Sequence, residues 1–157
     1  RVILVYDADT AGLKASLANC EAFLRAGFQV SAVPLPEGKD PDNIAQEQKL
    51  ETGKWLANRE QNFLQYFAIS LRGKNPGTDP NREEEAMQRL STLISVIPSE
   101  TLLLKCIEIM AGIFGCNTEV IQRKVNSILR QRKTASIKEK DKMAPRHIWY
   151  RYDCGGT

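Results

Sequence analysis

The chain has 157 residues and an ordinary globular composition, with 42% hydrophobic and 26% charged residues. No apolar run approaches the roughly 20 residues that a membrane-spanning helix needs. One histidine, His147, and four scattered cysteines give almost no support for a zinc site. The net charge of +3 is uneven, because residues 130–151 hold eight Lys and Arg against two acidic residues. The rest is therefore close to neutral, and the basic end is a weak indication of nucleic-acid contact.

The start of the chain indicates a segment of a larger intracellular protein. Residue 1 is Arg rather than Met, it directly precedes an apolar strand, and no signal peptide is visible. The cysteines form no CxxC pair, so a reduced, cytoplasmic protein is the default expectation. The length is sufficient for one ordinary domain with a core of its own.

The first part of the sequence predicts a βαβ unit. Residues 2–5 (VILV) form a continuous aliphatic run, which is typical of a strand buried on both faces of a parallel sheet. Apolar residues then recur at helical spacing over residues 11–26, and Gly27 ends that helix. Residues 28–33 predict a second strand, which prolines terminate. The crossover between two such parallel strands is right-handed in nearly all proteins.

Beyond the second strand the sequence predicts only helices. Asp40 is placed to cap a helix that starts with Pro41, and Asp79 with Pro80 starts another that runs to Val96. Three more helices are expected: over residues 58–73, where Phe63, Phe67 and Leu71 share a face; over residues 102–114, which Pro98 and Ser99 introduce and Gly115 ends; and from Asn117 or Thr118 to Arg132. Residues 133–157 show no sustained periodicity and predict a disordered tail.

The expected fold class is therefore α/β followed by all-α. The predicted divisions are residues 1–57, part of an α/β domain with parallel strands; residues 58–132, a helical subdomain; and residues 133–157, a basic flexible tail. The aromatic residues Trp55, Phe63, Tyr66 and Phe67 are interpreted as packing residues rather than as platforms on which bases stack.

Four aspartates follow the two predicted strands. Asp7 and Asp9 come directly after the first strand, and Asp40 and Asp42 lie a few residues beyond the second. Because the carboxyl ends of parallel strands meet at one edge of a sheet, we expect both pairs there. Four gathered carboxylates repel one another unless a divalent cation such as Mg²⁺ neutralises them. Such an arrangement is suited to nucleotidyl or phosphoryl transfer.

The spacing within the first pair favours a shared ion. Residues two positions apart in an extended segment point to the same side, so Asp7 and Asp9 can bind one cation. Gly12, together with small neighbouring residues, allows the backbone and a ligand to approach closely. The alternatives remain that Asp7 and Asp9 are solvated acids or helix caps, and that Asp40 is an N-cap, a role that is compatible with a metal site.

The two acidic motifs together resemble those of one family. Residues 7–12 (DADTAG) and residues 36–42 (PEGKDPD), each after a predicted strand, are similar to the D-x-D-x-A-G and P-x-G-x-D-P-D motifs in the Toprim domain of DnaG-type bacterial and phage DNA primases. The resemblance covers residues 1–48, which correspond to the second half of a Toprim domain. The predicted helices agree with the family's following subdomain only in order and type.

The resemblance implies that Asp7, Asp9, Asp40 and Asp42 form a metal site for Mg²⁺ or Mn²⁺, with Asp7 and Asp9 as catalytic residues. It implies template-directed RNA primer synthesis on single-stranded DNA from ribonucleoside triphosphates, in the cytoplasm, with a replicative helicase as a partner of the whole protein and no membrane association. The family's Toprim glutamate, zinc-binding domain and basic subdomain have no counterpart in this sequence. We therefore expect a fragment of a catalytic core that is inactive by itself.

Two other functions stay open at this point. The stretch VYDADT also resembles the D-x-D-x-T motif of haloacid-dehalogenase-type phosphatases, in which Asp7 would be the nucleophile and Asp9 the acid/base. Such enzymes need a longer α/β core, whereas this chain is expected to turn helical after residue 48. The third hypothesis is non-enzymatic: residues 58–132 would form a module that docks a replication partner.

Overall fold

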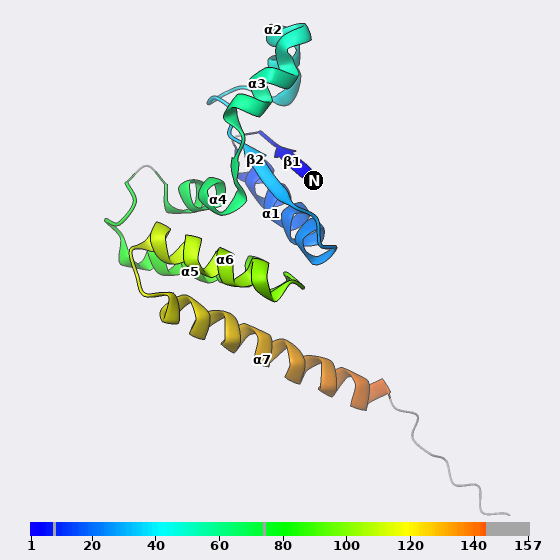
Figure 1. Ribbon diagram of the computed structural model, residues 1–157, viewed down its shortest axis with the longest axis vertical. Coiled ribbons are helices and arrows are strands. Elements are labelled where there is room, and N and C mark those ends of the chain that lie inside the picture. The colour runs from blue at the N-terminus through cyan, green and yellow to red at the C-terminus, as the bar shows by residue number, and fades with distance from the viewer. Residues whose placement is uncertain (8, 74, 144–157) are drawn as a thin grey trace, which may run out of the picture.

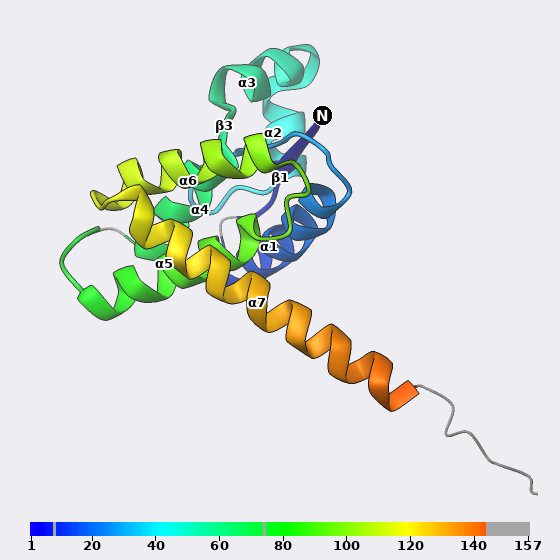
Figure 2. The same ribbon diagram turned by 60° about the horizontal axis from the view of Figure 1, so that its bottom comes forward.

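The computed structural model describes residues 1–7, 9–73 and 75–143. A small sheet is followed along the chain by packed helices (Figure 1; Figure 2). The elements are β1 (Val2–Val5), α1 (Thr10–Arg25), β2 (Val30–Val33), α2 (Pro41–Gln48), a 3₁₀ turn (Lys49–Glu51), α3 (Thr52–Arg59), β3 (Gln61–Asn62), α4 (Phe63–Arg72), α5 (Pro80–Ile94), α6 (Glu100–Phe114) and α7 (Thr118–Met143). The predicted class, α/β followed by all-α, is confirmed.

The sheet contains the predicted parallel pair and one strand that was not predicted. β1 runs parallel to β2, with Val2 opposite Val30 and Val5 opposite Val33. The strand order is β1-β2-β3, and the two-residue β3 pairs antiparallel with β2, so the sheet is mixed. With α1 as the crossover, β1 and β2 form the expected βαβ unit, and both strands end at the same edge of the sheet.

The predicted helix starts are confirmed by their capping hydrogen bonds. Asp79 Oδ1 accepts a hydrogen bond from the Asn81 amide at 3.0 Å, directly before Pro80 opens α5. Ser99 Oγ accepts the Leu102 amide at 3.3 Å at the start of α6. Short polar side chains at these positions satisfy amides that have no partner inside the helix. Local sequence therefore sets the helix boundaries in this part of the chain.

The last helix is longer than predicted. The sequence predicts a disordered tail from residue 133, but α7 continues to Met143. Residues 133–143 lack an apolar stripe and include four Lys, a residue that favours a helix without needing a surface to pack on. In Figure 1 this end of α7 extends away from the other helices. The remainder of the predicted tail, residues 144–157, lies outside the described residues.

The main hydrophobic core joins the α/β part to the helices. Its fully buried side chains come from α1, α4, α5, α6 and α7: Cys20, Leu24, Leu64, Phe67, Leu90, Ile94, Met110, Ile121 and Val125. Leu4 of β1 belongs to the same cluster. The core therefore runs across the predicted division at residues 57 and 58, and helix α4 packs directly against the βαβ unit.

A second, smaller core lies under α2 and α3. Val33, Leu35 and Ile44 are buried there, with Trp55 and Leu56 packed against them. This cluster anchors the segment that follows β2. Within the described residues, no helix has both the length and the apolar character needed to cross a lipid bilayer.

Candidate functional site

The turn between β1 and α1 carries the first two predicted site residues. β1 ends at Val5, and Asp9 is the N-cap of α1. Asp9 Oδ1 accepts a hydrogen bond from the Gly12 amide at 2.6 Å. Both Asp7 and Asp9 are exposed to solvent. The Gly12 amide, in the first turn of the helix, thus holds the Asp9 carboxylate in place, while the carboxylate remains exposed.

Gly12 is needed for the shape of this turn. A Cβ at residue 12 would overlap the backbone carbonyl oxygen of Asp7 and would lie 3.1 Å from Asp9 Oδ1. A backbone oxygen cannot move aside as the end of a flexible side chain can. Only glycine therefore lets the segment that carries Asp7 and Asp9 fold closely over the first turn of α1.

Asp7 and Asp9 line one cavity of about 320 Å³ at the carboxyl edge of the sheet. Three segments that are distant in sequence form its walls: Asp7, Asp9, Thr10 and Leu13 before and within α1, Pro34 and Leu35 after β2, and Tyr66 and Ser70 on α4. The first two segments follow neighbouring parallel strands, as the sequence predicts. The third wall belongs to the helical part of the chain.

The sequence predicts Tyr66 to be a packing residue only. In the structure Tyr66 also lines the cavity. Its ring is largely buried and packs edge-on against Phe67, with 5.1 Å between the ring centroids. Burial raises the pKa of the Tyr66 phenol above its ordinary value. No sequence motif marks Tyr66 or Ser70, because only the docking of α4 against the βαβ unit brings them to the aspartates.

Asp40 and Asp42 lie outside the residues that line this cavity. Asp40 is the N-cap of α2: its Oδ1 accepts the Asn43 amide at 2.6 Å, and its own amide donates to Asn43 Oδ1 at 3.2 Å. Asp42 is exposed in the first turn of α2. The neighbouring Lys39 forms an ion pair with Glu47, consistent with a charge-balancing role. The capping hydrogen bonds hold the Asp40 carboxylate against its own helix.

The structure thus brings the predicted residues together as one pair and not as a group of four. Across the described residues, no three His, Cys, Asp or Glu side chains are close enough to hold one metal ion. Asp7 and Asp9 share a cavity. Asp40 and Asp42 lie further along the segment that follows β2, whose first residues, Pro34 and Leu35, form another wall of that cavity. The involvement of all four residues in metal binding stays a prediction.

Residues 1–45 match the family model described as Toprim-like. All four predicted aspartates fall within this range. A DNA primase of Staphylococcus epidermidis is 29% identical over 127 residues, which are 80% of this chain and 21% of that protein. A DNA primase of Clostridium acetobutylicum is 33% identical over 66 residues, 42% of this chain and 11% of that protein.

Solved primase structures share the fold. A DNA primase domain from Pseudomonas aeruginosa superimposes with a TM-score of 0.60 at 23% identity, over 79% of this chain and 40% of that one. A DnaG primase catalytic domain bound to single-stranded DNA gives a TM-score of 0.57 at 25% identity, over 75% of this chain and 38% of that one. The chain is a homologue of part of the DnaG-type primases.

The chain spans about a fifth of the length of the curated relative from Staphylococcus epidermidis. The match to that relative continues well past the Toprim-like range into the helices, and the solved primase structures also align over about three quarters of the chain or more. Homology therefore covers both parts of the fold, the βαβ unit with the aspartates and the helices that pack on it.

The donor groups of the cavity fit a hard divalent cation. Proteins bind Mg²⁺ through one or two carboxylates and leave several waters on the ion. Asp7 and Asp9 supply two carboxylates, and among the residues that the structure describes no Cys or His side chain lines the cavity. One Asp9 oxygen accepts the Gly12 amide, and the other makes no hydrogen bond with the residues that the structure describes. This donor set suits Mg²⁺ or Mn²⁺ better than a softer metal.

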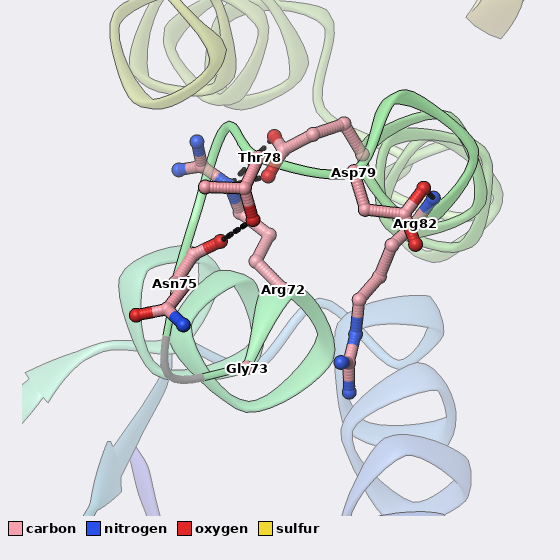
Figure 3. A pocket seen from close by; sticks show the side chains of 7 residues that line it. Arg72, Gly73, Asn75, Thr78, Asp79 and Arg82 are labelled. Atoms are coloured by element: carbon pink, nitrogen blue, oxygen red, sulfur yellow. Dashed lines mark hydrogen bonds and ion pairs between the residues drawn. The ribbon is translucent and has the colours of Figure 1, made fainter.

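The α4–α5 loop forms another pocket, in which Arg72 and Glu83 form an ion pair (Figure 3). Arg72 Nε lies 2.9 and 2.7 Å from the two carboxylate oxygens of Glu83, and Arg72 Nη1 donates to the Ile113 carbonyl at 3.0 Å. The hydrogen bond from Arg72 lowers the pKa of the Glu83 carboxyl. Arg72 thus connects α4, α5 and α6, and we interpret this pocket as structural.

Proposed function

We propose that this chain supplies the metal-binding part of a DNA primase catalytic core, in which Asp7 and Asp9 bind Mg²⁺ or Mn²⁺ for RNA primer synthesis. The observation that carries the proposal is the shared cavity at the sheet edge, lined by both aspartates of the Toprim-like segment. A binding site for a hard cation at the carboxyl ends of parallel strands is a recurrent arrangement in α/β proteins.

In this proposal each element of the turn has a task. Asp7 and Asp9 bind the cation, the first turn of α1 orients Asp9, and Gly12 sets the distance between the turn and the helix. A cation held by Asp7 and Asp9 would supply neutralisation of the charge on the triphosphate and on the leaving pyrophosphate. Asp40 and Asp42 add negative charge at the end of β2, where they are proposed to complete the metal site of the full protein.

The substrates and partners are inferred from the relatives. We propose single-stranded DNA as template and ribonucleoside triphosphates as substrates, because one of the similar solved structures is a primase catalytic domain bound to single-stranded DNA. Contact with a replicative helicase, through the whole protein, and action in the cytoplasm complete this proposal. This chain alone is expected to bind metal without making primers.

The phosphatase alternative has no comparable support. After β2 the described chain contains only the two-residue strand β3 and helices, so the longer α/β core of such enzymes is not formed there. The docking alternative is also weaker, because the apolar faces of α4, α5, α6 and α7 close a common core. Both relatives and solved structures are primases.

Primer synthesis by a full-length protein that contains this segment tests the proposal. Asp9→Asn removes the charge but retains a good N-cap, because asparagine caps helices as well as aspartate does. Asp79→Asn is a matched control, since it makes the same change at the cap of α5. We expect labelled primers from the unaltered protein and from Asp79→Asn, and a loss of at least about a hundredfold with Asp9→Asn. Equal primer yields from both variants would remove Asp9 from the chemistry.

A further inference from the structure

The cavity of the two aspartates also has hydroxyl groups in its walls. Thr10 follows Asp9 at the start of α1, and Tyr66 and Ser70 lie on α4. Because Tyr66 and Ser70 are four residues apart in one helix, their side chains share a face. The site therefore combines carboxylates from the βαβ unit with hydroxyls from a helix of the other half.

Of the two α4 residues that line the cavity, Tyr66 is the one whose hydroxyl is not already donated to a described backbone carbonyl. The Tyr66 hydroxyl has no hydrogen-bond partner among the described residues. The buried hydroxyls without a partner belong to other residues, Ser16 and Ser91. Ser70, in contrast, donates its hydrogen to the Tyr66 carbonyl at 2.9 Å.

The Tyr66 ring is held rigidly. The residue keeps 9% of its surface exposed. The ring also packs against Phe67 at an interplanar angle of 70°. A side chain that is fixed before binding loses little conformational entropy when it contacts a ligand.

The cavity has room for more than a metal ion. A hydrated ion with about six waters, each taking about 30 Å³, fills little more than half of the 320 Å³. The lining of the cavity includes the hydroxyl-bearing residues Thr10 and Tyr66. A ligand that fits has oxygen atoms that bind a divalent cation and also accept hydrogen bonds, which is the chemistry of a polyphosphate.

We propose that Tyr66 is a nucleotide-binding residue whose hydroxyl donates a hydrogen bond to the polyphosphate of a ribonucleoside triphosphate held beside Asp7 and Asp9. The inference rests on the proposed function, since the cation bound by the aspartates brings the polyphosphate to the cavity. A neutral phenol is a suitable donor there, because an anionic phosphate oxygen is a strong acceptor. Helix α4 thereby takes part in substrate binding as well as in core packing.

Binding to the 157-residue chain tests the inference. The affinities for Mn²⁺ alone, and then for ATP and for inorganic tripolyphosphate in the presence of Mn²⁺, are measured by calorimetry for the unaltered chain and for Tyr66→Phe. Tyr66→Phe keeps the ring and its contact with Phe67, so the fold is retained. We expect unchanged Mn²⁺ affinity and an about tenfold loss of affinity for both ATP and tripolyphosphate, as for one hydrogen bond to a charged group.

Tyr6→Phe is the matched control. The Tyr6 hydroxyl accepts a hydrogen bond from Asn19 Nδ2, and Tyr6 is not among the residues that line the cavity. We expect this variant to bind Mn²⁺, ATP and tripolyphosphate as the unaltered chain does. An equal loss with Tyr6→Phe would show a general effect of the fold and would overturn the assignment to Tyr66.

The other outcomes separate this inference from the proposed function. If Mn²⁺ binds but Tyr66→Phe retains full affinity for ATP and tripolyphosphate, the role of Tyr66 is wrong while the metal site stands. If only ATP binding weakens, the contact is to the sugar or base, and the polyphosphate assignment is overturned. If the unaltered chain does not bind Mn²⁺, the proposed function fails, and the inference fails with it.

Discussion

At the sheet edge, Asp7 and Asp9 are exposed and their turn is shaped by Gly12, whereas in the helical body Leu90 and Met110 have no exposed surface. A group that binds a hydrated ion must remain accessible to water, so its position depends on local backbone geometry and on caps. A buried apolar side chain contributes about 1.5–3 kcal/mol through removal from water. The site therefore depends mainly on the residues of the β1–α1 turn and the stability of the fold mainly on the buried helical core, and α4 contributes to both.

The largest effect is expected in the helical body. Phe67 on α4 is fully buried, and Phe67→Ala should lower the free energy of unfolding by about 3–5 kcal/mol. Ile69→Ala is the matched control on the same helix, because Ile69 is 65% exposed, and it should change stability by less than about 0.5 kcal/mol. Urea unfolding followed by circular dichroism measures both. Equal losses for the two variants would mean that the body does not carry the stability.

The next largest effect is expected at the sheet edge. Replacing Gly12 by alanine should lower stability, whereas the same replacement of an ordinary helical glycine raises it. Gly12→Ala places a Cβ against the Asp7 carbonyl oxygen and should cost about 1–3 kcal/mol, together with metal affinity. Gly112→Ala, in α6, meets nothing within 4 Å and should raise stability by about 0.5–1 kcal/mol. Thermal unfolding and Mn²⁺ titration of both variants check this. A Gly12→Ala variant as stable as Gly112→Ala would contradict the close approach in the turn.

The smallest effect concerns the contact between the two regions, and it depends on pH. Burial raises the pKa of the Cys20 thiol on α1 to about 12 and that of Cys106 on α6 to about 11. Above the ordinary thiol pKa of 9.0, the unfolded chain loses these protons while the native chain keeps them. The native state then binds more protons, so the free energy of unfolding falls as the pH rises from 9 to 11, by at most about 1.4 kcal/mol per thiol at pH 10.

Cys20→Ala should make this alkaline loss of stability smaller. Cys116→Ala is the control, because Cys116 is only partly buried. Unfolding free energies measured between pH 8 and pH 11 for the two variants give the comparison, and Tyr66 contributes equally to both. If the free energy of unfolding falls with pH equally steeply in Cys20→Ala and Cys116→Ala, the Cys20 thiol is not shielded from solvent by the packing of α1 on the helical body.

Much of the fold was predictable because local chemistry decides it. The apolar run of β1, the caps of α2 and α5, and the end of α6 at Gly115 all depend on residues within one helical turn of the boundary. β3 was not predictable, because two polar residues carry no pattern and become a strand only by pairing with β2. The extension of α7 to Met143 was also missed, since helix propensity rather than apolar periodicity determines it.

The candidate site was predictable to the extent that it is a local motif. The D-x-D pattern identified Asp7 and Asp9, and the structure places both at one cavity. The capping role of Asp40 could be predicted from the proline that follows it. That Asp40 lies outside the residues that line the cavity could not be predicted. Tyr66 could not be assigned to the site from the sequence, because more than fifty residues separate it from Asp9 and only the packing of α4 brings it there.

Locating the Mn²⁺ ion on the chain tests the proposed metal site at Asp7 and Asp9 most directly. Paramagnetic broadening of amide NMR signals during a Mn²⁺ titration of the 157-residue chain maps the place where the ion binds. We expect the signals of the β1–α1 turn, around Gly12, to broaden first. Asp9→Asn should weaken Mn²⁺ binding at least tenfold, and Asp79→Asn should leave it unchanged. Broadening that begins elsewhere, or that is unchanged in Asp9→Asn, would contradict the assignment of the metal site to Asp7 and Asp9.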